Sequence, residues 1–237
     1  MDVMDEMYVL VISAATLGVI HTLLGPDHYL PFIVLSRARK WTRTRTLWIT
    51  FISGIGHVGG SVILGLIGIA MGISLHRLEA LEANRGALVG WMLIAFGVLY
   101  TAYGVYRYLR RGAHMHLPAF LRPKAIRHRD LHLEEEHLEK EDAGRITPWI
   151  LFLIFVFGPC EVLIPMLIYP AAQPSTVGIF LVALVFGIAT VGTMMLVVSL
   201  GYRGISLVRF RGREHQIHLL AGLVILFSGL GMQFLGL

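Results

Sequence analysis

The chain has 237 residues, of which 56% are hydrophobic and 15% are charged, and its mean hydropathy is +0.71. Soluble domains are about 45–50% apolar and about 25% charged, so this composition excludes a water-soluble globular domain. It equally excludes a disordered chain. A single cysteine excludes a disulfide framework within the chain.

Six segments are apolar enough, and close enough to the ~20 residues that a helix needs, to cross a membrane. They are residues 7–36, 46–75, 86–106, 148–172, 175–202 and 217–237. The acidic start MDVMDEM is unlike the basic start of a signal peptide. The sequence therefore predicts an all-α integral membrane protein with six transmembrane helices.

The basic residues are distributed unevenly between the two sides of these spans. Eighteen of the 20 lie in 37–45, 107–145 and 203–213, and the other two are Arg77 and Arg85. Because Lys and Arg collect on the cytoplasmic side, we expect both termini outside the inner membrane of a bacterium or archaeon. The net charge of +5 therefore reflects basic residues that orient the spans in the membrane. The expected partner is the lipid bilayer and not a nucleic acid.

The two halves of the chain share a weak internal repeat. Gly25-Pro26 matches Gly158-Pro159, and GIGHVGG (54–60) matches GIATVGT (187–193), both at an offset of 133 positions. Gly90 and Gly97 match Gly222 and Gly229 at an offset of 132, one position less. These matches predict two three-helix repeats.

A repeat with an odd number of spans enters the membrane in opposite directions, which is the inverted topology of many secondary transporters. We expect a first repeat at 1–106, a charged cytoplasmic loop at 107–147 and a second repeat at 148–237. Gly-Pro breaks helices, so the first and fourth helices should be broken at these dipeptides. In such folds the substrate binds beside the broken helices, near the midplane.

Few ionisable groups are expected inside the membrane, where they are costly and usually functional. They are His21, Asp27, His28, His57 and Glu161, with Cys160 as the only thiol. Imidazole, thiolate and carboxylate together suit divalent first-row metals, whereas alkaline-earth ions prefer oxygen ligands alone. The six residues are therefore our predicted metal ligands.

Several of these residues also have simpler interpretations. Asp27 and Glu161 would stabilise the first turn of a new half-helix, and Asp27 could orient a histidine instead of binding metal. His57 could be a packed, hydrogen-bonded histidine. Cys160 could be a small apolar side chain.

HTLLGPDH (21–28) and the Gly56-His57 pair resemble the signatures of the nickel/cobalt transporter (NicO-type) family and of related urease-accessory-like membrane proteins. The first motif has one residue more between His21 and Asp27 than the family pattern, and Val58-Gly59 replace Ser-Thr. FGPCEVLIP (157–165) also resembles a Pro-Cys element of the superfamily that includes cytochrome-c-biogenesis thiol carriers. The resemblance implies transport of nickel, cobalt or a similar ion.

The segment 114–145 is rich in histidine and acidic residues. His128 and His132 are four apart and would share a helix face, so they are possible secondary metal contacts. A solvated helix of mixed charge explains the same pattern.

Our leading hypothesis is a secondary transporter of a divalent transition metal, which is its substrate, with no organic cofactor and no enzymatic activity. No GxxxxGK[ST] loop for ATP is present. One alternative is an intramembrane metalloenzyme or thiol-redox protein using the same cluster. Another is an anion or sulfur-oxyanion exporter, against which the carboxylates argue because they would repel the substrate.

Overall fold

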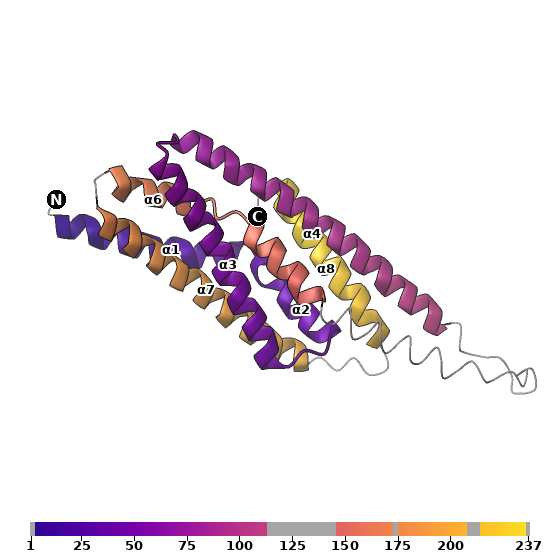
Figure 1. Cartoon of the computed structure of the whole chain (residues 1–237). Helices are drawn as coiled ribbons and strands as arrows, with labels where there is room; N and C mark the ends of the chain where they lie inside the picture. The colour runs from indigo at the N-terminus through magenta and orange to yellow at the C-terminus, as the bar shows by residue number, and fades with distance from the viewer. Residues whose placement is uncertain (1–2, 113–145, 173–174, 208–213, 236–237) are drawn as a thin grey trace, which may run out of the picture.

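The computed structural model describes residues 3–112, 146–172, 175–207 and 214–235, and every regular element in these ranges is a helix (Figure 1). The elements are α1 (Val3–Leu24), η1 (Pro26–His28), α2 (Leu30–Ala38), α3 (Arg43–Ala70), α4 (Leu75–Gly112), the helix Ile146–Phe157, α6 (Leu163–Ala172), α7 (Thr176–Leu207) and α8 (Glu214–Leu235).

Five of these helices, α1, α3, α4, α7 and α8, are long and apolar enough to cross a membrane. Their outward faces carry large apolar side chains, for example Ile12, Leu99, Phe180 and Ile188, each more than half exposed. Water would disfavour such a surface, whereas lipid tails accommodate it. The chain therefore has the character of a multi-pass membrane protein.

Two predicted spans have different bounds in the structure. The third, expected at 86–106, lies within α4, which begins eleven residues earlier at Leu75 and ends at Gly112. The fourth, expected at 148–172, consists of the helix Ile146–Phe157, a non-helical stretch at 158–162, and α6.

The backbone turns sharply between α1 and α2. Gly25 has an extended backbone conformation and precedes Pro26, the first residue of the single 3-10 turn η1. Proline has no N–H to continue the helix, and its ring collides with the carbonyl four residues earlier. A Cβ at Gly25 would collide with the imidazole of His28, so this turn requires glycine.

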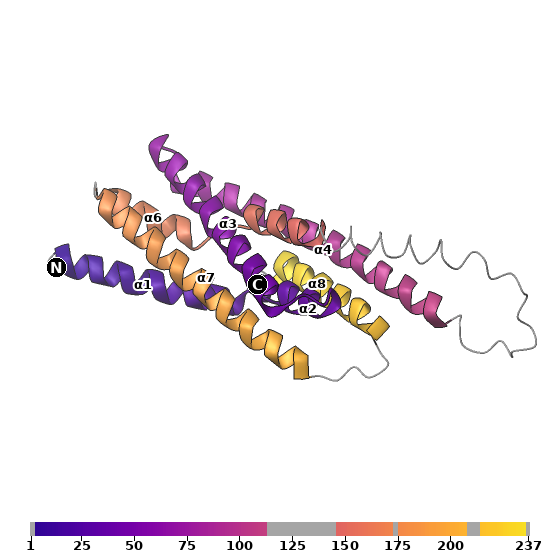
Figure 2. The same cartoon turned by 60° about the horizontal axis from the view of Figure 1, so that its bottom comes forward.

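α4 and α8 lie side by side in both views (Figures 1 and 2) and run antiparallel. Glycines let their backbones approach closely: a Cβ at Gly97 would lie 2.5 Å from the amide nitrogen of Leu226. At Gly229, the residue 132 positions after Gly97, a Cβ would lie 2.8 Å from the amide nitrogen of Ile94. Leu226 is also 132 positions after Ile94, so the two contacts are reciprocal. We call this interface the α4–α8 seam.

α3 and α7 make a second reciprocal contact, at the offset of 133. A Cβ at Gly54 would lie 3.2 Å from Val191 Cγ2, and a Cβ at Gly187 would lie 3.3 Å from Val58 Cγ1. Gly187 is 133 positions after Gly54, and Val191 is 133 after Val58. The bend between α1 and α2 and the non-helical stretch before α6 each contain a buried residue, His28 and Cys160.

Candidate metal site

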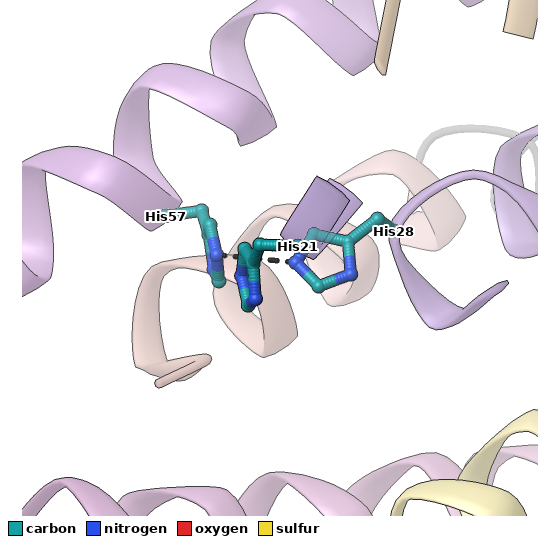
Figure 3. Close-up of side chains that lie close together, drawn as sticks. All are labelled: His21, His28 and His57. Atoms are coloured by element: carbon teal, nitrogen blue, oxygen red, sulfur yellow. Dashed lines mark hydrogen bonds between the residues drawn. The ribbon is translucent and has the colours of Figure 1, made fainter. Parts of the chain in front are cut away.

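Three histidines from three elements converge inside the bundle (Figure 3): His21 in the last turns of α1, His28 in η1 and His57 in α3. One ring nitrogen from each lies within 4.8 Å of the others. His28 and His57 are buried and His21 is half-buried. Among the described residues, this is the group of His, Cys, Asp and Glu side chains arranged to hold a metal ion.

The turn at Gly25 produces this convergence. In a continuous helix, His21 and His28 would lie two turns apart on one face. Because the chain bends after Leu24, their ring centroids are instead 4.7 Å apart, edge to face. His57 lies 4.9 Å from His28 and stacks 6.1 Å from His21.

The hydrogen bonds of His28 determine which of its nitrogens is free. Its Nδ1 lies 3.1 Å from the carbonyl oxygen of Gly25 and 3.2 Å from Oδ1 of Asp27. Both partners are acceptors, so Nδ1 carries the proton and donates it. In the neutral ring Nε2 then holds a lone pair, and this atom lies 3.3 Å from Nε2 of His57.

His57 is arranged in a similar way. It donates a hydrogen bond to the backbone carbonyl of Phe155, and its Nδ1 lies with that carbonyl beside Gly158. We infer that Nδ1 makes this bond, which leaves Nε2 of His57 directed at Nε2 of His28, and in the neutral rings both of these atoms carry lone pairs. Two facing lone pairs repel unless a cation, either a proton or a metal ion, lies between them.

The distance between His28 and His57 suits tetrahedral coordination. Metal–imidazole bonds of 2.0–2.1 Å place neighbouring nitrogens about 3.4 Å apart, close to the 3.3 Å between His28 and His57. Cys160 Sγ lies 3.9 Å from Nε2 of His21, so small movements would make the thiol a fourth ligand. Asp27 occupies the far side of His28, the place of a carboxylate that orients a metal-bound histidine.

The structure does not bring Glu161 to this group. Its side chain is exposed, and its carboxylate lies beside Gly86 of α4. The possible secondary contacts His128 and His132 lie outside the described residues.

A buried carboxylate that the sequence analysis did not identify lies at the second irregular segment. Glu82 of α4 is fully buried, pairs with Arg85, and accepts hydrogen bonds from Ser61 Oγ and from the backbone N–H of Cys160. Arg85 donates to the carbonyls of Val156 and Gly158. The pair thus satisfies the backbone groups that the interrupted helix leaves without partners.

One signal in the sequence could have revealed this pair. Glu82 and Arg85 are three apart, which places them on one helix face, and Leu78 and Val89 continue that face. The interpretation of this segment as an external loop hid the pattern.

A cavity reaches the site from one side. Its lining includes Asp27, His28, His57, Leu93 and Met232, so it opens between η1, α3, α4 and α8.

Comparisons with protein-family models, with curated proteins and with solved structures gave no match.

Proposed function

We propose that this protein is a secondary transporter of a divalent transition-metal cation of the nickel or cobalt kind. The observation that carries the proposal is the pair of imidazole Nε2 atoms that lie 3.3 Å apart beside a third histidine. Nitrogen ligands with a nearby thiol favour such metals over magnesium or calcium.

The reciprocal contacts support an inverted repeat. Leu30 and Leu163 begin α2 and α6 and are 133 positions apart, as are Arg43 and Thr176, which begin α3 and α7. In the proposed fold, α1 with α2 makes one interrupted crossing, and the helix Ile146–Phe157 with α6 makes its counterpart. These two crossings and four continuous helices make six, with both termini outside the cytoplasmic membrane.

Transport would follow from movement of one repeat against the other around the histidines. Metal and protons compete for the same nitrogens, so protons would exchange for the metal ion. A proton gradient in either direction across the membrane would drive this exchange. Proton coupling therefore needs no further carrier in the membrane.

The test is metal uptake into proteoliposomes that contain the purified protein. We expect the initial rate of Ni²⁺ or Co²⁺ uptake to fall at least ~10-fold in His57→Ala, because loss of a ligand or of its orienting partner typically costs 10–100-fold in affinity or activity. His76→Ala is the matched control, since His76 is exposed at the start of α4, and its rate should equal that of the unmodified protein. Unchanged uptake by a folded His57→Ala protein would refute the proposal.

Metal binding should also weaken as the pH is lowered. Below the pH at which the imidazoles protonate, protons occupy the nitrogens that bind metal. Titration of Co²⁺ at two pH values, followed by its visible absorption, measures this competition. Equal affinities at pH 5 and pH 7.5 would contradict coordination by histidine.

A further inference from the structure

A second cavity lies away from the histidines, where α2 and α7 end and α8 begins. It has about 890 Å³ of empty space, including its open mouth. Its walls include Arg37, Lys40, Trp41, Tyr202, Ile205 and Ile217. Two of these residues are cations, and the described lining residues include no carboxylate.

The backbone acceptors beside this cavity already have partners. At the end of α2, the carbonyl of Ser36 accepts from the N–H of Trp41, and that of Arg37 accepts from the N–H of Lys40. The carbonyl of Trp41 accepts from the hydroxyl of Tyr202.

Two donors beside the same cavity have no hydrogen-bond partner in the part of the chain that the structure describes. They are Nε of Arg37 and the indole Nε1 of Trp41, whose side chain is only 4% exposed. Buried donors are nearly always paired in folded proteins. The cavity therefore combines positive charge with unused donors, which complements a ligand rich in negatively charged acceptors.

The backbone of Lys40 supports the same conclusion. Its φ is +52°, the only positive φ of a non-glycine residue in the described part of the chain. Lys40 occupies the position after the end of α2 where glycine is usual. Lysine disfavours a positive φ, but at this position it places a cation at the cavity.

We propose that this cavity binds a phosphate group, either of an anionic phospholipid or of a small soluble phosphate compound. Arg37 and Lys40 supply the charge, and Trp41 supplies an additional N–H donor. Ile205 and Ile217 form an apolar wall beside them that suits the glycerol and first methylenes of a lipid. Basic pockets between membrane helices have the chemistry that binds such headgroups. A bound phosphate would join the end of α2 to α7 and α8.

Native mass spectrometry of the full-length protein in detergent tests this proposal. The probes are phosphatidylglycerol, phosphatidylcholine with the same acyl chains, and inorganic phosphate. We expect phosphatidylglycerol to bind at least ~10-fold more tightly than phosphatidylcholine if the ligand is a lipid, and inorganic phosphate to bind and compete if it is a soluble compound. In either case, binding should fall at least ~10-fold in the Arg37→Gln, Lys40→Gly double variant.

Two further variants separate charge in this cavity from charge elsewhere. Arg43→Gln removes an exposed cation from the same end of the bundle that does not line the cavity, and binding should be unchanged. Trp41→Phe keeps an aromatic ring and removes the indole donor, so binding should weaken severalfold even if the double variant does not fold. Equal binding by the unmodified protein, the double variant and Trp41→Phe, or no preference for phosphate, would overturn the proposal.

Discussion

The sequence alone leaves two roles for Asp27, because a carboxylate can bind a metal ion directly or orient a histidine that binds the metal ion. Its Oδ1 lies 3.2 Å from Nδ1 of His28, and the Nε2 of the same ring faces His57. A single bend in the backbone therefore places Asp27 behind the ring and not among the metal-facing nitrogens. We infer that Asp27 fixes the tautomer and orientation of His28.

Replacing Asp27 by asparagine tests this role. The amide keeps the size of the side chain but removes the charge that holds the Nδ1 proton of His28, so metal affinity should fall about 10–100-fold. Isothermal titration with Co²⁺ in detergent measures the change.

Glu161→Gln is the matched carboxylate control. Glu161 is exposed and points to α4, so we expect no change in affinity. A loss in Glu161→Gln equal to that in Asp27→Asn would show that simple charge, and not the contact with His28, determines binding.

Sequence reasoning found the three histidines because charged or polar groups stand out in apolar segments. It missed Glu82 for the opposite reason: Glu82 and Arg85 lie where a hydropathy window reads a polar loop. Their burial depends on Val156, Gly158 and Cys160, which are more than 70 positions away. Such a partnership cannot be read from local composition.

At the scale of elements, the non-helical stretch between Phe157 and Leu163 depends on α4. Glu82 receives the N–H of Cys160, and Arg85 holds two carbonyls of the same stretch. These bonds place Cys160 beside His21. The position of Cys160 beside the histidine cluster therefore depends on an ion pair, Glu82 with Arg85, that is not itself part of that cluster.

Glu82→Ala should strongly destabilise the protein. It leaves the part-buried Arg85 guanidinium without its carboxylate, and the N–H of Cys160 keeps only Ser61 Oγ of its two acceptors. Breaking a largely buried pair in this way costs up to about 3 kcal/mol. Thermal unfolding in detergent, followed by circular dichroism, measures the loss.

Glu79→Ala is the control, because Glu79 is exposed one turn earlier in α4, and its unfolding midpoint should not change. The Glu82→Met, Arg85→Met double variant should recover only part of the stability, since the carbonyls of Val156 and Gly158 still lack donors. Full recovery would show that the pair does not support the non-helical backbone.

At the scale of the whole molecule, the α4–α8 seam tolerates no added volume at its glycines. Gly97→Ala would bring a Cβ to 2.5 Å from the backbone of Leu226, so the helices must separate, at a cost of about 1–3 kcal/mol. A lower unfolding midpoint in detergent would report this cost.

Gly192→Ala is the matched glycine control in α7. A Cβ there meets nothing within 4 Å, and alanine favours a helix by up to about 1 kcal/mol over glycine. We expect stability to stay the same or rise. A midpoint for Gly97→Ala as high as that for Gly192→Ala would mean that the seam is loosely packed.

The sequence predicted an all-helical membrane protein because hydropathy depends only on composition along the chain. It did not predict the length of α4, since Glu82 and Arg85 in the early part of that helix have partners in the second half of the chain. The repeat offset indicated which residues correspond in the two halves, but not that α4 and α8 would pack together through reciprocal contacts.

The reciprocal contacts along the α4–α8 seam have the form of an isologous interface, in which one patch meets a copy of itself across a two-fold axis. Gly97 meets Leu226 as Gly229 meets Ile94, although all four belong to one chain. In a homodimer such patches belong to two separate subunits, which associate at a rate that depends on protein concentration. Here one chain carries both patches at a fixed effective concentration, so dilution cannot separate α4 from α8 as it would separate two subunits.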